Sequence, residues 1–298
     1  MRPDLYKVSI VVTTKNRKAD LEKCIKSCQS LKNVAEILVF DDGSTDDTSA
    51  FVQETFPEIS LYRSEQSLGL INARTKCASL AKGDLIVSID DDCVFQHEDA
   101  IVEITEYFSH PKVAAVTIPI INVFISDAIV QQGMGSREDF YITAQYMGGA
   151  HMIRKDIFLQ MGGYYDNLIR QEEETDFCMR LYGNGYWVRI ANCQKPILHY
   201  HSASRNLYLI SFYRARNQFI LNYKNAPLFL IPLAILKQAF SLILFERKNG
   251  QLKACLSGFK DAIKSIFSGR IRRTPVSFKT YFFFKKLRSK QWLRMEVD

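Results

Sequence analysis

The stretch from Asp84 to Asp92 reads Asp-Leu-Ile-Val-Ser-Ile-Asp-Asp-Asp, an apolar run that ends in three consecutive aspartates. A short aliphatic run of this kind is typical of a buried β-strand. Packed carboxylates repel one another, raise one another's pKa and attract a cation. Because hard oxygen ligands suit Mg²⁺ or Mn²⁺, the end of this strand is a candidate site for a metal that holds a phosphate. A solvated acidic turn is the alternative.

Two more predicted strands end in polar clusters. Residues 8–12 precede a cluster from Thr13 to Arg17, and residues 36–40 precede a cluster from Asp41 to Ser44. Helical spacing between the strands, including a helix over residues 70–81 closed by Gly83, predicts a mainly parallel sheet. Ligands bind such sheets at the carboxyl ends of the strands. We therefore expect the three polar clusters to share one edge of the sheet.

The composition excludes several classes of protein. The chain has 298 residues, 47% hydrophobic and 24% charged, which is typical of a globular protein rather than a disordered one. Its seven cysteines form no Cys-x-x-Cys pair and are odd in number, which argues against a disulfide framework and favours a reducing compartment. The apolar run before Lys15 is too short for a signal peptide, so we expect a cytoplasmic protein.

Taken in order, residues 8–17, 40–48 and 85–92 resemble the signature of the family 2 inverting glycosyltransferases. The resemblance continues through residues 148–154, 161–164 and 173–180 to His199 and covers roughly residues 7 to 225. It implies an α/β fold of the GT-A type, a nucleotide-binding domain with a mainly parallel mixed sheet. It also implies the bacterial type of enzyme that builds cell-surface polysaccharides.

The same resemblance implies roles for individual residues near the donor. Thr13 and Asp41 match positions that bind the base and ribose of a nucleotide sugar, and Arg74 matches a basic residue near the nucleotide. Asp90 and Asp92 match the outer residues of an Asp-x-Asp motif, with Asp92 as the direct metal ligand. Two further contacts are implied: Asp91 on the ribose, and His199 as a second metal ligand, with His201 as its alternative.

The resemblance also implies a catalytic base in the run Glu172-Glu173-Glu174. The family has Glu-Asp here and uses the second acid, so Glu174 takes the role, although the register between Glu173 and Glu174 stays open by one residue. Glu adds one methylene, so the backbone must lie further from the acceptor. Gly149, Ala150 and Glu173 are expected to contact the acceptor. The alternative is an acidic first turn favoured by the helix dipole.

These roles imply a metal-dependent enzyme, with Mn²⁺ or Mg²⁺, that transfers a sugar with inversion from a nucleotide-sugar donor. UDP-sugars are the default donor. The acceptor is a saccharide or lipid-linked saccharide in cell-surface glycan synthesis. One alternative is a sugar nucleotidyltransferase, although the loop from Thr13 to Arg17 lacks the glycines that such an enzyme needs. The other is a non-catalytic scaffold of the same fold that binds donor or membrane.

The last part of the chain differs in charge from the rest. Residues 246–298 hold fourteen Lys and Arg against four Asp and Glu, whereas the preceding residues carry a small acidic excess. We divide the chain into a GT-A domain at residues 1–225 and an amphipathic, basic helical region at residues 226–298. The latter is expected to lie on an anionic membrane, at the inner face of the cell membrane. No base-reading module is recognisable, so no nucleic-acid partner is expected.

Overall fold

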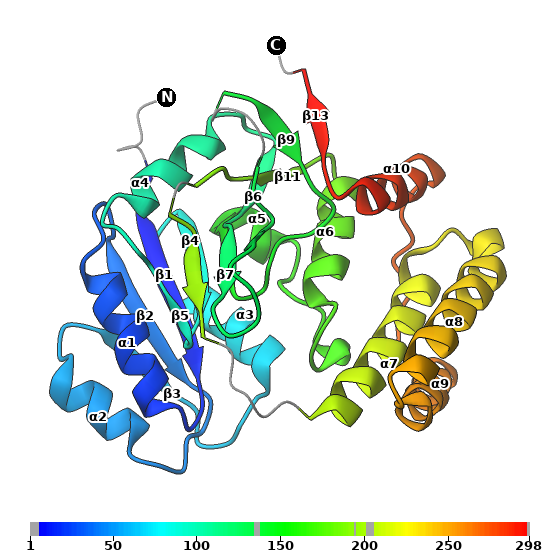
Figure 1. Cartoon of the computed structure of the whole chain (residues 1–298), viewed down its shortest axis with the longest axis horizontal. Coiled ribbons are helices and arrows are strands. Elements are labelled where there is room, and N and C mark those ends of the chain that lie inside the picture. The colour runs from blue at the N-terminus through cyan, green and yellow to red at the C-terminus, as the bar shows by residue number, and fades with distance from the viewer. Residues whose placement is uncertain (1–5, 134–137, 194, 201–205, 297–298) are drawn as a thin grey trace.

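The computed structural model describes residues 6–133, 138–193, 195–200 and 206–296. It is an α/β fold with helices gathered toward the C-terminus (Figure 1), which confirms the predicted fold class. The strands are β1 (Val8–Thr14), β2 (Glu36–Asp41), β3 (Ser60–Arg63), β4 (Leu85–Asp90), β5 (Cys93–Val94), β6 (Val113–Thr117), β7 (Ile120–Asn122), β8 (Ile129–Val130), β9 (Phe140–Ile142), β10 (Ala150–Arg154), β11 (Trp187–Ile190), β12 (Ile197–His199) and β13 (Leu293–Met295). The helices are α1 (Lys18–Gln29), α2 (Thr48–Thr55), α3 (Leu70–Leu80), α4 (Ala100–Thr105), α5 (Lys155–Gln160), α6 (Glu173–Gly183), α7 (Leu207–Asn225), α8 (Ile231–Lys248), α9 (Leu252–Phe267) and α10 (Phe278–Lys290), with 3₁₀ turns at Glu106–Phe108, Asp166–Leu168 and Leu228–Leu230.

The main sheet has the strand order β13-β9-β11-β6-β10-β4-β1-β2-β3. Its N-terminal strands β4, β1, β2 and β3 are parallel neighbours, with Thr13 paired to Asp90 and Thr14 paired to Asp41. This register confirms that the three polar clusters meet at one edge. Strand β10 is antiparallel to both β4 and β6, so the sheet is mixed.

Burial explains why β1 and β4 are continuous aliphatic runs. Almost every residue of both strands is buried, so neither face shows the alternation of a half-exposed strand. Gly83 does not have the predicted helix-ending role, because α3 already ends with Ala81 in an extended conformation. A Cβ at Gly83 would lie 2.6 Å from the backbone nitrogen of Ser9, so glycine is required there for the close approach of β1.

A smaller sheet has the order β5-β12-β7-β8. Strand β12 is antiparallel to β5, with His199 paired to Cys93, and parallel to β7. Because β5 follows the aspartate triplet directly, this pairing brings His199 beside the carboxyl end of β4. The strands of this smaller sheet have two or three residues each, too few to show a hydrophobic period.

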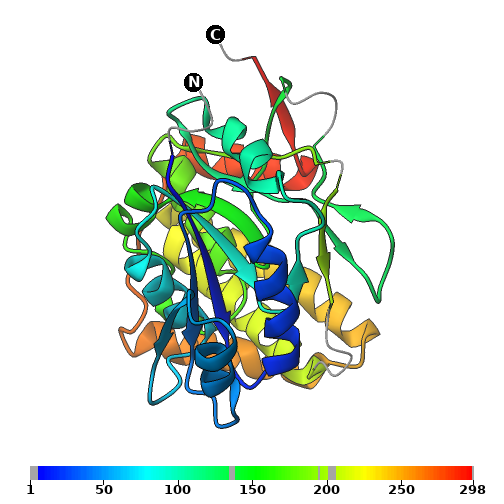
Figure 2. The same cartoon turned by 90° about the vertical axis from the view of Figure 1, so that its left-hand side faces the viewer.

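The C-terminal helices α7, α8 and α9 pack against one another at one end of the molecule and lie behind the N-terminal strands in Figure 2. The last residues return to the main sheet, where β13 pairs with β9. The division at residue 225 stays a prediction.

Helix α9 buries mostly small residues, and Phe259 is its one large buried side chain. It meets α7 through small residues, and a Cβ at Gly258 would lie 2.3 Å from the carbonyl oxygen of Phe212. Of the apolar stripe in its sequence, Phe259 is buried, but Ile263 and Phe267 are exposed. The outward face of α9 is therefore apolar and, through Lys260 and its other lysines, basic.

Helix α8 leaves most of its apolar surface uncovered. Within Leu228–Lys248, which includes the preceding turn, an 18-residue window has a mean hydropathy of 2.1 and is 6% buried, so this segment is long and apolar enough to cross a membrane. Leu236 and Phe240 are each 68% exposed. An apolar surface of this size is typical of a protein that meets a membrane or a partner.

A buried ion pair joins α6 to α7. Lys224 Nζ donates to Asp176 Oδ1 at 2.7 Å, and both side chains are at most 3% exposed. Asn225 and Arg180 also donate to Asp176, each at 2.9 Å. Burial opposes charge on Asp176, but these donors and cations outweigh it and hold the pKa of Asp176 below its ordinary value.

We expect Lys224→Met to lower the free energy of unfolding by about 3 kcal/mol or more, because it leaves part of the Asp176 charge uncompensated in the interior. Urea denaturation measures this change. Lys248→Met, at the exposed end of α8, is the matched control and is expected to change stability by less than about 0.5 kcal/mol. Equal effects of the two variants would contradict a structural role for the pair.

Candidate active site

A cleft of about 360 Å³ lies at the carboxyl ends of β1 and β4. It is lined by residues from the three polar clusters and from α3, among them Thr13, Arg17, Asp42, Arg74, Asp90 and Asp91. Parallel strands place ligand sites at this edge, so the cleft is the candidate donor site.

The three aspartates after β4 have three different sets of partners. Asp90 pairs with Arg74. Asp91 accepts from Thr14 Oγ1 at 2.7 Å and pairs with Arg17 at 3.0 Å. Burial raises the pKa of Asp91 to about 7, although the charge of Arg17 opposes the shift.

Asp92 stands between a cation and an imidazole. Its Oδ2 lies 3.0 Å from Arg17 Nη2, and its Oδ1 lies 3.1 Å from His199 Nε2. Burial opposes ionisation of Asp92, but the hydrogen bond from His199 and the charge of Arg17 outweigh it and lower its pKa. Asp92 is therefore a carboxylate at neutral pH.

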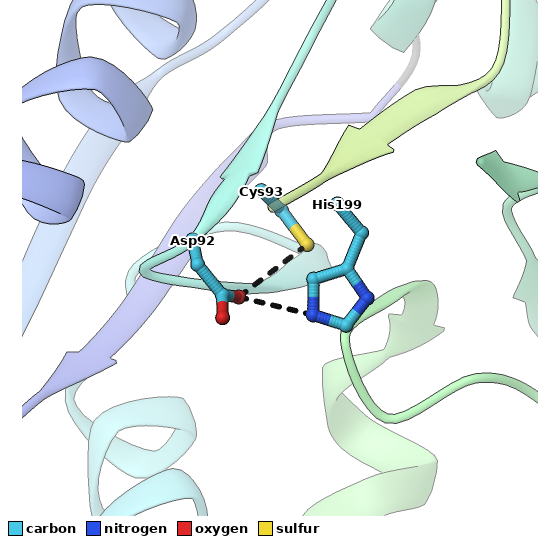
Figure 3. A group of neighbouring side chains, drawn as sticks. All are labelled: Asp92, Cys93 and His199. Atoms are coloured by element: carbon cyan, nitrogen blue, oxygen red, sulfur yellow. Dashed lines mark hydrogen bonds and ion pairs between the residues drawn. The ribbon is translucent and has the colours of Figure 1, made fainter. Parts of the chain in front are cut away.

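Asp92, Cys93 and His199 can converge on one divalent cation, since their ligand atoms lie within 4.8 Å of one another (Figure 3). His199 Nδ1 faces Asn122 Oδ1 at 3.0 Å while Nε2 faces Asp92, so a neutral ring has one N–H for two acceptors. A cation bound at Nε2 would resolve this arrangement and leave the Nδ1 N–H to donate to Asn122. Burial raises the pKa of the Cys93 thiol well above its ordinary value, so Asp92 and His199 are the better ligands for Mn²⁺ or Mg²⁺.

Arg74 links the donor cleft to the acidic start of α6. This 5% exposed side chain pairs with Asp90, with Glu173 at 3.2 Å and with Glu174 at 3.6 Å. Burial, and then the charge of Glu173, raise the pKa of Glu174 well above its ordinary value, while Arg74 opposes the shift. A carboxyl group in this environment titrates closer to neutral pH than an exposed one.

The Gly148-Gly149 turn leaves room for these carboxylates. A Cβ at Gly148 would lie 2.0 Å from Glu174 Oε1, and a Cβ at Gly149 would lie 3.0 Å from Asp90 Oδ2. The glycines therefore let the main chain approach both acids. Glu174 keeps 17% of its side chain exposed, whereas Glu173 keeps only 2%.

The turn before α6 is strained and is held by one amide. Gln171 and Glu172 both have left-handed backbone angles, with φ of 67° and 66°. The buried Asn217 Nδ2 on α7 donates to three carbonyl oxygens of this turn, those of Leu168, Arg170 and Gln171. Helix α7 therefore positions the glutamates.

Two predicted contacts lie away from the cleft surface. Asp41 is fully buried, and its carboxylate accepts from the Ser44 N–H at 2.8 Å and from Ser49. Ala150 is fully buried in β10. Their roles stay predictions, as do those of Thr13 and Gly149; His201 lies outside the described residues.

Two side chains in the cleft were not singled out from the sequence. Asp42 lines it and accepts from Ser67 Oγ and from the N–H of Leu68 and Gly69. Arg17 bridges Asp91 and Asp92. Both belong to polar clusters at strand ends, which was the available signal, but only the fold shows which members face inward.

An α/β sheet with an acidic cleft at its strand ends, beside residues able to hold a divalent cation, is an arrangement suited to an enzyme that binds nucleotides. A model described as glycosyl transferase family 2 matches residues 9–162, more than half of the chain. The chain therefore belongs to glycosyl transferase family 2.

Curated relatives agree with this family. An uncharacterized glycosyltransferase of Haemophilus influenzae is 26% identical over 186 residues, which cover 58% of this chain and 61% of that protein. A glucosyl-dolichyl phosphate glucuronosyltransferase of Haloferax volcanii is 26% identical over 207 residues, which cover 59% of this chain and 63% of that protein. The chain thus spans about three fifths of the length of these relatives.

Solved structures show the GT-A fold. The mannosyltransferase PcManGT of Pyrobaculum calidifontis, in complex with GDP-Man and Mn²⁺, has a TM-score of 0.59 and 16% identity over 97% of this chain and 85% of its own. Residues 1–349 of S. aureus TarS with UDP-GlcNAc have a TM-score of 0.62 and 15% identity over 87% of this chain and 81% of their own.

Replacing the Glu174 carboxylate is expected to change how stability depends on pH. The pKa of Glu174 is higher in the folded protein than in the unfolded chain. Its contribution to the free energy of unfolding is therefore fully present below the pKa that it has in the unfolded chain. This contribution is lost as the pH rises through the pKa that it has in the folded protein. As the pH rises above the ordinary pKa of Glu, Glu174→Gln should therefore gain stability relative to the wild type. The gain is about 1.4 kcal/mol for each tenfold difference between the folded and unfolded acid dissociation constants.

Urea denaturation at a series of pH values measures this difference. Glu54→Gln, at an exposed position on α2, is the control and is expected to show no such trend. A Glu174→Gln difference that does not vary with pH would show that burial does not raise the pKa of this carboxyl group.

Proposed function

We propose that the chain is a divalent-cation-dependent, inverting glycosyltransferase that moves a sugar from a nucleotide-sugar donor, UDP-linked by default, to a saccharide or lipid-linked saccharide acceptor. The observation that carries this proposal is the position of Arg74 between Asp90 and Glu174. This arrangement supports the proposal because one guanidinium contacts both Asp90, at the candidate donor cleft, and Glu174, the candidate base.

The donor side supports binding of a nucleoside diphosphate. Thr13 and Asp42 line the cleft where the base and ribose would bind, and Arg17 supplies positive charge next to Asp91 and Asp92. Asp92 and His199 would hold the cation, with Cys93 nearby. A divalent cation there supplies charge against the diphosphate as it leaves the sugar. The solved relatives with GDP-Man and Mn²⁺ or with UDP-GlcNAc bind ligands of this kind.

The acceptor side needs a base. Glu174 takes the proton from the acceptor hydroxyl as the oxygen attacks the anomeric carbon from the face opposite the diphosphate. One displacement inverts the configuration at that carbon. A raised pKa keeps Glu174 basic enough to accept this proton near neutral pH. Glu174 is preferred to Glu173 because its side chain is less buried and faces Gly148.

The exposed apolar and basic surfaces of α8 and α9 support a location on the cytoplasmic face of an anionic membrane. The archaeal relative is named for a lipid-linked acceptor, glucosyl-dolichyl phosphate, which fits the same location. This membrane contact would place the active site near lipid-linked acceptors.

The direct test is a panel of UDP-, dTDP- and GDP-sugars with Mn²⁺ or Mg²⁺, scored by nucleotide release. We expect one donor to turn over only with the metal, and Asp92→Ala and Glu174→Gln each to lower the rate by about 10²-fold or more. Donor binding without release, even with membrane extract as acceptor, would indicate the scaffold, and formation of a nucleotide sugar from a triphosphate would indicate the nucleotidyltransferase. Failure to bind any donor would exclude a transferase.

The assignment of the base has its own test. Glu173→Gln removes an Arg74 partner but keeps the Glu174 carboxylate, so we expect a smaller loss of kcat than in Glu174→Gln. In the wild type, kcat/KM should decrease as the pH is lowered, with a midpoint above the ordinary pKa of Glu. Glu174→Asp should still show a decrease of kcat/KM at low pH, because it keeps a carboxyl group. A larger loss in Glu173→Gln would move the base to Glu173.

A further inference from the structure

A groove of about 590 Å³ lies between α7, α8 and α10, outside the donor cleft. Its lining includes apolar residues, among them Leu233 of α8 and Phe282 of α10. It also includes three cationic residues, Lys237 of α8 and Lys285 and Arg288 of α10. A groove with both kinds of lining suits a ligand that has an apolar part and an anionic part.

The cations of this groove have few carboxylate partners. Arg288 pairs with Glu172 at 3.5 Å, and Lys285 Nζ has Asn222 Oδ1 at 3.5 Å and the Tyr281 ring at 5.4 Å. Within the described residues, no carboxylate pairs with Lys237 or Lys285. Burial and the neighbouring Arg288 charge lower the pKa of Lys285. An anion in the groove would relieve this repulsion.

The groove is connected to the candidate active site through Arg288. This residue also lines a second cavity of about 500 Å³, together with Gln131, Gln145, Met147 and Trp292. Met147 directly precedes Gly148, which faces Glu174. Amides and an indole ring are groups that bind sugars by hydrogen bonding and stacking.

The partner of Arg288 lies on the same helix start as the proposed base. Glu172 caps α6 immediately before Glu173 and Glu174 and also accepts from Gln218 Nε2 at 2.6 Å. Gln218 lines the groove as well. The groove, the second cavity and Glu174 are therefore joined by side chains in direct contact or adjacent in sequence.

Building on the proposed function, we propose that the acceptor is a saccharide joined to a lipid through a phosphate or diphosphate, which binds at Lys237, Lys285 and Arg288. Its sugar lies in the second cavity, toward Glu174, and its lipid chain follows α8. A lipid phosphate is favoured over free phosphate because the same helix that supplies Lys237 exposes Leu236 and Phe240. These residues lie outside the lining of the groove and add exposed apolar surface on α8.

Binding of the full chain to vesicles tests this site. The probes are phosphatidylcholine vesicles that contain a polyprenyl phosphate and vesicles of equal surface charge that contain phosphatidylglycerol. The wild type is expected to bind the polyprenyl phosphate vesicles about tenfold more tightly, because a phosphate monoester can accept several charge-assisted hydrogen bonds. Inorganic pyrophosphate should remove this preference, whereas sulfate at equal ionic strength should not.

A pair of double variants distinguishes binding in the groove from nonspecific attraction by positive charge. Lys237→Gln/Lys285→Gln should lose the preference, whereas Lys279→Gln/Lys286→Gln, which removes equal charge from exposed positions on α10, should keep it. Three outcomes would contradict the proposed phosphate site. The wild type could bind both kinds of vesicle equally, the groove variant could keep the preference, or both variants could lose the preference equally. The pyrophosphate competition needs no variant, so it tests the site even if the groove variant does not fold.

Donor turnover distinguishes this result from a failure of the proposed function. A wild type that shows no metal-dependent nucleotide release would contradict the transferase itself. Metal-dependent release with no vesicle preference would contradict only the phosphate site. With a lipid-linked acceptor, the groove variant should raise the acceptor KM about tenfold with little change in kcat, and an unchanged KM would also overturn the site.

Discussion

The buried guanidinium of Arg74 is the interaction on which the candidate site depends. It lies between Asp90 at the end of β4 and Glu173 and Glu174 at the start of α6, so one side chain joins the parallel half of the sheet to the second half of the chain. Three carboxyl groups so close together would be costly to bury without a cation. Because Arg74 remains charged at any physiological pH, it holds them together while leaving Glu174 free to titrate.

The parallel strands and their polar ends could be predicted from the sequence. Residues of β1, β2 and β4 form short aliphatic runs because both faces of these strands are buried, and the register then places Thr13 beside Asp90. The orientation of neighbouring side chains could not be predicted. Asp41 and Asp42 are adjacent in sequence, but Asp41 faces inward to Ser44 and Ser49, whereas Asp42 lines the cleft. Adjacent residues at a strand end point to opposite sides, so only the full fold distinguishes them.

Long-range contacts explain the other differences. His199 reaches Asp92 because β12 pairs with β5, and strands this short carry no periodic signal. Gly83 looks like a helix end in the sequence, but its requirement comes from β1, more than seventy residues earlier. On α9, Gly258 brings α7 so close that mainly small residues pack there while Phe267 is left exposed, a division that the apolar spacing alone does not show. In each case the deciding partner is distant in sequence.

The repulsion among the carboxyl groups of each acidic triplet is reduced in the same physical way. Asp90, Asp91 and Asp92 are directed to Arg74, Arg17 and His199. Glu172, Glu173 and Glu174 are directed to Arg288, to Arg74 and to the space beside Gly148. Each triplet thus directs its carboxyl groups to different places, and Glu174 lies furthest from its cation, 3.6 Å from Arg74. The strained turn that Asn217 holds is what turns Glu172 outward while Glu173 turns inward. A helix with an ordinary first turn would satisfy the helix dipole equally well, but it would not divide its acids between the donor cleft and the α8–α10 groove.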